Sequence, residues 1–335
     1  MKRPTPVQVC VLLGTALFAV RPLQATLLLT PAGTSLGFTL TTFVSGYNAQ
    51  YGPLSQGISS AGTVTTGSLL NNKIYVFADV DGQTLSSALS STSYACTTGN
   101  CNWSMTTAGG QVYGAQAFGG VFEHFASNGT FTPIPNLQAA SLTGYLGVWN
   151  NPTNNHLIAS SNQGLVDIDP VAGTYRVINA SVFPDGITVS PDGTTIYAEV
   201  SGTIQSFNLT TGALIRTFSV GHSPDGTGVV SGGILNGFVV VNNNDGTVGL
   251  LDPTKANGDP NQYVIIANNG TRGDFVSPDG SNGTLFLSQT DQVARLSCGA
   301  NCSIGSTNTA PEPLAFALAG LGLVGLAGVR RYRRG

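Results

Sequence analysis

The chain has 335 residues, of which only 9% are charged, whereas Gly alone contributes 44. Soluble proteins ordinarily carry about 25% charged residues, so this composition argues against helical bundles, coiled coils and charge-driven disorder. The net charge is −3, but seven of the 13 Lys and Arg side chains lie in the two ends, and the segment between them carries −9. A segment this acidic lacks the basic surface that phosphate backbones require, and the sequence therefore predicts no nucleic-acid partner.

The N-terminus has the layout of an export signal. Lys2 and Arg3 precede a mostly apolar stretch at residues 7–20, and the small residue Ala25 ends the segment. This order of charge, apolar run and small residue is typical of a secretory signal peptide. We therefore expect residues 1–25 to be removed, with cleavage after Ala25.

Six β-rich segments recur in the body, which we place at residues 26–309. Short strands separated by Gly-rich turns are typical of sheet hairpins. Successive segments are 38 to 47 residues apart, close to the length of one four-stranded propeller blade. The apolar residues that define this spacing are Ile74, Val112, Leu157, Ile196, Phe238 and Leu285. The body is thus predicted to be an all-β, six-bladed β-propeller.

The ring of blades must close on itself, and the last blade needs an outer strand from elsewhere in the chain. We predict that residues 37–43 supply this strand, because a closed ring buries the strand edges that an open ring would expose.

Two short motifs carry a resemblance to a known group of propellers. Residues 189–197 (VSPDGTTIY) and 276–280 (VSPDG) each lead into a predicted strand, and they resemble the repeat of YVTN-type bacterial β-propellers. In a Ser-Pro-Asp-Gly hairpin turn, Pro fixes φ and Gly supplies a positive φ. The motif therefore indicates fold rather than chemistry.

The body contains four cysteines, since Cys10 lies in the predicted signal peptide. An even number in an exported chain favours disulfides. Close spacing favours two short loops, each of which adds modest stability: Cys96–Cys101 and Cys298–Cys302. The alternative is a zinc site with four thiolates, but neither spacing is the usual one for zinc, and export disfavours free thiolates.

Candidate ligand-binding residues fall at the junctions between blades, which in propellers surround the mouth of the central channel. Asp185, Asp225, Asp274 and His222 lie there and are predicted to converge, with a divalent cation as the ligand that such a set would bind. The alternative is turn chemistry, since Asp185 and Asp225 each precede a Gly.

The other sequence motifs give little evidence of a metal site or of catalysis. Asp79 and Asp81 resemble the start of a calcium loop, but Ser90 stands where the bidentate Glu should be. The sequence holds no nucleophile elbow, zinc-protease helix or phosphate-binding loop, and it predicts no catalytic residue and no bound cofactor.

The C-terminal segment, residues 310–335, has three parts in order. The triplet Pro311, Glu312 and Pro313 precedes 16 uncharged residues, 314–329, and the chain then ends in an arginine cluster: Arg330, Arg331, Arg333 and Arg334. As a helix the 16 residues span about 24 Å, and snorkelling arginines extend their reach across a bilayer core of about 30 Å. The cluster would stay on the cytoplasmic side and leave the body outside the membrane.

This tail closely resembles the PEP-CTERM sorting signal. The resemblance implies that an exosortase-type enzyme, a membrane transpeptidase, cuts near Pro311-Glu312-Pro313 after a transient membrane stage. A plain tail anchor would share the helix and the arginines but would not need the Pro-Glu-Pro motif.

Together these features predict an exported, cell-surface or extracellular-matrix propeller that acts as a binding or structural module. Its expected partners are the sorting enzyme, the membrane before processing, and extracellular polysaccharide or surface proteins. The alternative is a metal-dependent, lactonase-like hydrolase or lyase with a channel site that uses Asp185, Asp225 or Asp274.

Overall fold

The computed structural model describes residues 26–304 except 48–50, 69–71, 97–100 and 300–302. The predicted signal peptide and the predicted membrane helix at 314–329 lie outside these residues. No helix in the part of the chain that the structure describes is long and apolar enough to cross a membrane.

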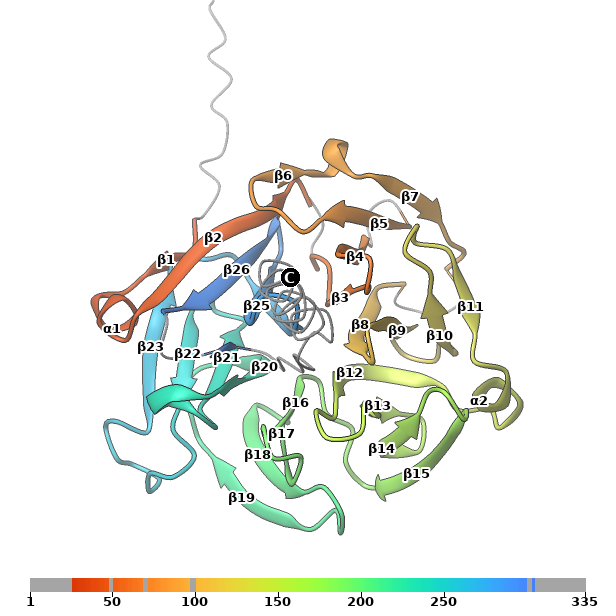
Figure 1. Cartoon of the computed structure of the whole chain (residues 1–335). Coiled ribbons are helices and arrows are strands. Elements are labelled where there is room, and N and C mark those ends of the chain that lie inside the picture. Colours follow the sequence, from red (N-terminus) through yellow and green to blue (C-terminus); the bar gives the residue numbers. More distant parts are fainter. Residues whose placement is uncertain (1–25, 48–50, 69–71, 97–100, 300–302, 305–335) are drawn as a thin grey trace, which may run out of the picture.

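The described residues form a six-bladed β-propeller (Figure 1), as predicted. Each blade is an antiparallel meander of four strands that runs from the central axis outward. The first three blades are β3 (Gln56–Ile58), β4 (Thr63–Ser68), β5 (Lys73–Ala78) and β7 (Ser90–Ser93); β8 (Trp103–Ala108), β9 (Gln111–Gln116), β10 (Phe122–Phe125) and β11 (Phe131–Pro133); and β12 (Gly144–Asn150), β13 (Leu157–Ser161), β14 (Gly164–Asp169) and β15 (Thr174–Asn179).

The fourth and fifth blades are built in the same way, and the sixth blade takes its outer strand, β2 (Phe38–Ser45), from the N-terminal region. They are β16 (Ile187–Val189), β17 (Thr195–Val200), β18 (Thr203–Asn208) and β19 (Leu214–Phe218); β20 (Pro224–Ser231), β21 (Val239–Asn243), β22 (Val248–Leu251) and β23 (Tyr263–Asn268); and β24 (Gly273–Asp279), β25 (Thr284–Gln289), β26 (Gln292–Cys298) and β2 (Phe38–Ser45). Small elements complete the chain: β1 (Leu28–Leu29), α1 (Pro31–Ser35), β6 (Gln83–Thr84), η1 (Leu85–Ser87), α2 (Pro135–Ala139), η2 (Gly233–Leu235) and β27 (Ser303–Ile304).

The apolar core lies between the blades. Neighbouring blades pack face to face, so their middle strands are buried on both sides. Strand β13 (Leu157–Ser161) and strand β22 (Val248–Leu251) are buried throughout, and their apolar residues belong to clusters shared by adjacent blades. This explains why the sequence shows short apolar runs rather than strict alternation.

One repeat was predicted out of phase. Val112, Leu157, Ile196 and Leu285 lie in the second strand of their blades, and Phe238 directly precedes β21. Ile74, in contrast, lies in β5, the third strand of the first blade. The second strand there is β4, whose sequence TVTTGS has a single large apolar residue and thus no apolar pattern to detect.

The predicted ring closure is confirmed. Strand β2 pairs antiparallel with β26, from Phe38 opposite Cys298 to Ser45 opposite Gln292. A bulge between Thr42 and Val44 places Phe43 between them, fully buried against the ring of Phe286. The N-terminal strand β2 therefore completes the blade formed by β24, β25 and β26, which removes an open edge.

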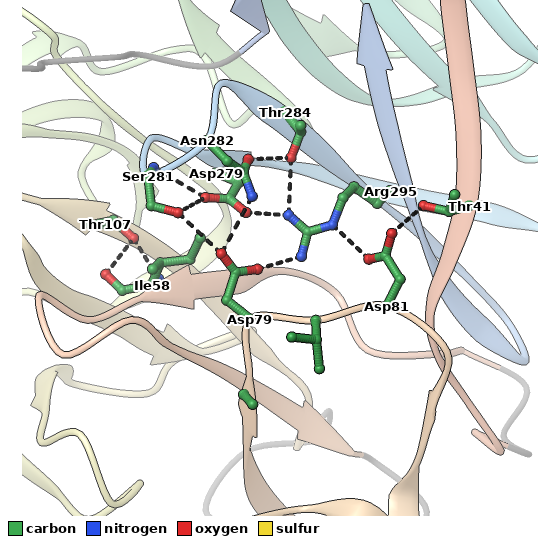
Figure 2. Close-up of polar contacts among 12 residues, drawn as sticks. Thr41, Ile58, Asp79, Asp81, Thr107, Asp279, Ser281, Asn282, Thr284 and Arg295 are labelled. Atoms are coloured by element: carbon green, nitrogen blue, oxygen red, sulfur yellow. Dashed lines mark hydrogen bonds and ion pairs between the residues drawn. The ribbon is translucent and has the colours of Figure 1, made fainter.

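A buried arginine fastens this closure (Figure 2). Arg295 on β26 donates to Asp79 and to Asp81 Oδ1, the latter at 2.8 Å, in the segment between β5 and β6. It also donates to Asp279 at the end of β24, whose side chain is completely buried. Asp81 in turn accepts a hydrogen bond from Thr41 on β2. The two carboxylates that resemble a calcium loop thus bind a guanidinium.

The Ser-Pro-Asp-Gly motifs differ in structure. In the first, Gly193 has φ +71° and Asp192 accepts from Ser190 Oγ, which gives the predicted hairpin turn. In the second, β24 continues through the motif to Asp279, whereas β16 ends at Val189, so the turn comes later and the positive φ falls at Gly283. Asp279 looks like a turn residue in sequence, yet it belongs to the ion-pair network of Arg295.

The disulfide Cys96–Cys101 is present, with Cα atoms 5.1 Å apart, in the connection between the first two blades. Its sulfurs cannot serve as thiolate ligands, so the four-cysteine zinc site is ruled out. Cys302 lies outside the described residues, and the Cys298–Cys302 pairing stays a prediction.

Candidate functional site: the channel mouth

The innermost strands of the six blades surround the central axis, and each contacts the next around the ring. On the side of the fourth to sixth blades, backbone packs directly on backbone. A Cβ added to Gly186 would lie 2.1 Å from the carbonyl oxygen of Asp225, and one added to Gly226 would lie 2.5 Å from that of Asp274. The junctions predicted from sequence are therefore tightly packed against one another.

This packing explains the two Asp-Gly pairs. Among the described glycines, those with positive φ do not include Gly186 or Gly226, so neither pair forms the tight turn that the alternative interpretation required. Glycine stands there because any side chain would overlap the next blade's backbone.

Three of the predicted residues gather around an arginine that the sequence had not singled out. Arg272, just before β24, donates from Nη2 to Asp225 Oδ2 at 2.8 Å and from Nη1 to Asp274 Oδ2 at 2.5 Å. Both carboxylates are buried, at 2% and 3% exposed, whereas Asp185 beside them is partly exposed. A fourth acid, Glu199 on β17, lies at the edge of the group, which we call the channel acid cluster: Asp185, Glu199, Asp225 and Asp274 with Arg272.

Burial dominates the protonation of the channel acid cluster. Burial first, and then the negative charges of Asp274 and Glu199, together raise the pKa of Asp185 to about 8, although Arg272 opposes them. Burial raises the pKa of Asp274 only to about 6, because Arg272 binds it directly. Burial also raises the pKa of Asp225 well above its usual range, and the negative charges of Asp274 and Asp185 act in the same direction. One guanidinium does not balance four carboxylates in this setting.

His222 does not join the cluster. Its Nδ1 lies 2.6 Å from Asp245 Oδ2, and its ring lies beside Tyr263 in the fifth blade. In the described residues no group of three His, Cys, Asp or Glu side chains is arranged to hold a metal ion. Of the four predicted ligands, the structure therefore brings three carboxylates together and leaves the histidine outside.

Exposed aromatic rings lie in the connections around the channel mouth, and one of them contacts the cluster. Large exposed aromatic side chains in the described part of the chain are Tyr51, Phe118 and Phe183, at 37%, 43% and 46% exposed. The Tyr51 ring lies 4.8 Å from the Arg272 guanidinium. Phe118 and Phe183 flank Tyr145, with ring centroids 4.8 Å and 5.9 Å from it.

These rings come from three separate connections. Phe118 is in the β9–β10 turn and its N–H donates to the carbonyl of Tyr145 at the start of β12. Phe183 lies two residues before Asp185, and Tyr51 precedes β3. Next to them Leu54, Leu146 and Phe275 pack together from three blades. The channel mouth thus combines aromatic rings in edge-to-face contact with the acid cluster.

Sequence reasoning missed Arg272 and the aromatic rings. Arg272 is one of only six basic residues in the body, which was a usable signal because so acidic a body must pair its buried carboxylates. The rings gave no signal, since turn aromatics at positions 51, 118 and 183 share no spacing.

A second hollow lies at the periphery, between the second and third blades. Two adjoining grooves of about 540 and 330 Å³ share Gln111, Tyr113, Pro170 and Val171 in their linings. The two strand histidines are there. His124 bonds Gln111, and His156 bonds Asp167. Each histidine thus bonds a residue of its own blade.

The sorting residues predicted from sequence, Pro311, Glu312, Pro313, Arg330, Arg331, Arg333 and Arg334, lie outside the described residues.

Comparison with known proteins supports the fold. No protein-family model matches the chain, and no curated protein matches it in sequence. Among solved structures, a gluconolactonase from Xanthomonas campestris aligns with a TM-score of 0.55 at 15% identity over 80% of this chain and 93% of its own. Virginiamycin B lyase from Staphylococcus aureus gives 0.48 at 13% over 77% and 99%, and the Swd1 propeller of Myceliophteria thermophila gives 0.46 at 11% over 73% and 83%. At these identities the likeness extends to architecture alone: the chain shares the β-propeller fold.

Proposed function

We propose that this protein is an exported propeller, delivered to the cell surface by an exosortase-type sorting system, whose channel mouth binds extracellular polysaccharide. The observation that carries the binding role is the group of three aromatic side chains in edge-to-face contact at the channel mouth: the exposed Phe118 and Phe183, with the partly exposed Tyr145 between them. Exposed aromatic faces stack on the apolar faces of sugar rings, and neighbouring carboxylates accept hydrogen bonds from hydroxyl groups. Large exposed apolar side chains grouped at one place mark a binding surface.

Delivery rests on the N-terminal and C-terminal sequence patterns. A signal peptide at 1–25 and a tail with Pro311-Glu312-Pro313, an apolar segment and four arginines would route the propeller through the membrane and release it outside. A polysaccharide ligand fits that destination.

The alternative, a metal-dependent hydrolase or lyase, requires free carboxylates in the channel. Arg272 takes one oxygen of Asp225 and one of Asp274, the two most deeply buried members of the predicted ligand set. A guanidinium therefore stands where that hypothesis needs a metal ion, and we favour binding over catalysis.

The test is affinity electrophoresis of the full-length chain in detergent against a panel of bacterial polysaccharides. Replacing Phe118 and Phe183 by Ala should weaken binding about tenfold or more, because each stacked ring contributes roughly 1 kcal/mol. The control is Ile215→Ala, an equally exposed side chain on the outer strand β19, which should bind as the unchanged protein does. Equal retardation of the aromatic double variant and the control, or no retardation by any polysaccharide, would overturn the proposal.

A further inference from the structure

Asp225 has an oxygen that the fold leaves unpaired. Its Oδ2 accepts from Arg272, but its Oδ1 is buried and has no hydrogen-bond partner. A buried carboxylate oxygen without a partner costs free energy, and native proteins usually place such an atom where a ligand or water will meet it. A donor is therefore expected at this position.

The charge of the surroundings indicates what kind of donor. Four carboxylates, Asp185, Glu199, Asp225 and Asp274, act on one another there, and Arg272 is the cation among them. A neutral hydroxyl could satisfy Asp225 Oδ1 but would supply no counter-ion, so the acids that Arg272 does not balance would stay protonated. A donor that also carries positive charge satisfies both demands.

A divalent metal fits this position poorly. Calcium takes six to eight oxygen ligands, whereas Arg272 already occupies Oδ2 of Asp225 and Oδ2 of Asp274. A primary ammonium is a compact cation with three donors and needs only a few acceptors. Asp185, the partly exposed member of the cluster, gives it a route in from solvent.

The aromatic neighbours identify the molecule that carries the ammonium. The ring of Tyr51 lies against the guanidinium of Arg272, and the exposed Phe183 lies two residues before Asp185 in the chain, so aromatic side chains accompany the cluster in both segments. A flexible polyamine has no ring to stack on them, but an amino sugar presents an ammonium directly on a ring with an apolar face.

We infer that the channel mouth recognises a polysaccharide with free amino groups, whose ammonium group binds between Asp185 and Asp225 while its sugar rings stack on the exposed aromatics. The inference rests on the proposed function and narrows its ligand class to de-N-acetylated amino sugars. Binding of the ammonium should release protons from the channel acid cluster, because a cation stabilises the ionised carboxylates.

The experiment is isothermal titration of the full-length chain, in phosphate and in Tris at the same pH near 7, with three probes. They are a glucosamine oligosaccharide, its fully N-acetylated counterpart of equal length, and spermidine. We expect the free-amine oligosaccharide to bind at least tenfold more tightly than the acetylated one, with an enthalpy that differs between buffers because protons are released.

Variants separate this inference from the proposed function. Asp225→Asn should abolish the preference for the free amine, and Asp185→Asn is a second variant in case the first fails to fold. Asp245→Asn, another Asp before a Gly but outside the cluster, should keep the preference. Phe118→Ala with Phe183→Ala should weaken both oligosaccharides equally.

Each remaining outcome overturns the inference. Equal affinity for the two oligosaccharides would show that the ammonium group plays no part in recognition, while leaving the proposal of polysaccharide binding intact. If spermidine bound as tightly as the free-amine oligosaccharide, the sugar rings would contribute nothing to recognition. Failure of the free-amine oligosaccharide to bind would refute the inference but not the proposed function, which is tested separately by the polysaccharide panel and the aromatic double variant.

Discussion

Arg295 on β26 forms an ion pair with Asp79, and this contact joins the last blade of the ring to the segment that follows the third strand of the first blade. The side chain of Arg295 is 7% exposed, and its guanidinium also lies 4.7 Å from the ring of Phe286. One buried cation thus links segments more than 200 residues apart at the seam where the propeller closes.

Replacing Arg295 by Met should destabilise the propeller by about 3–5 kcal/mol, because it leaves the fully buried Asp279 without its counter-ion. Asp81→Asn is the matched comparison. Its side chain is 36% exposed, and removing an exposed pair costs only about 0–1 kcal/mol. Thermal and urea unfolding of both variants would measure the difference, and equal stabilities would show that the network does not hold the seam.

Gly186→Ala should destabilise the protein by about 1–3 kcal/mol, the usual cost of forcing an extra carbon into a packed site. The atom it would meet, the carbonyl oxygen of Asp225, belongs to the backbone of the next blade and cannot rotate away. Gly299→Ala is the control, because its nearest neighbour would be 3.8 Å away and its φ is not positive. Differential scanning calorimetry should find an unchanged Tm for the control only, and an unchanged Tm for Gly186→Ala would contradict the close packing of the inner strands.

The sequence revealed the architecture more readily than the chemistry, and particular residues show why. The blade period could be detected because apolar strand residues recur where neighbouring blades pack, and the N-terminal strand followed from the need to close an edge. Strand β4 was missed because Thr and Gly fill it without an apolar pattern.

At the channel mouth, Asp185, Asp225 and Asp274 were found because all three share one position in the repeat. Arg272 escaped notice although it precedes one of them by two residues, because pairing across blades depends on three-dimensional packing that no local pattern encodes. His222 was included for its position near Asp225 in sequence, but it lies in the bend before β20, and its side chain contacts Asp245 instead.

Stability should fall as the pH rises from about 4 to about 8. Burial raises the pKa of Asp185 to about 8, so across this range the native state holds a proton that the unfolded chain, with an ordinary pKa near 4, has lost. Each such proton lowers the free energy of unfolding by about 1.4 kcal/mol per pH unit. The raised pKa values of Asp274, about 6, and Glu123, about 7, add to the fall at lower pH.

Asp185→Asn should therefore flatten the decline between pH 7 and 8, as measured by urea unfolding at each pH. Asp192→Asn is the control, because hydrogen bonds from Ser190 and Thr194 lower the pKa of Asp192 and confine its effect to acid pH. An Asp185→Asn variant that declines as steeply as the unchanged protein would show that Asp185 is ionised in the folded state.

We expect the C-terminal segment to anchor the protein in the membrane only until processing removes it. We expect the two prolines of Pro311-Glu312-Pro313 to stop a helix from continuing outward and to favour an extended backbone around Glu312, which a processing enzyme could read. We expect the arginine cluster at 330–334 to fix the orientation in the membrane, so replacing its arginines by Gln should impair retention or orientation before cleavage.

Mass spectrometry of the protein from its native host should find a mature C-terminus close to Pro311, with residues 314–329 absent. Changing Pro311, Glu312 and Pro313 to Ala should block this processing and leave the chain in the membrane fraction, because a plain anchor needs only the apolar segment and the arginines. The matched control replaces three residues of the preceding stretch, 305–309, and should be processed normally. Recovery of chains that end at Gly335, in a host shown to possess the sorting enzyme, would leave a simple tail anchor as the correct description.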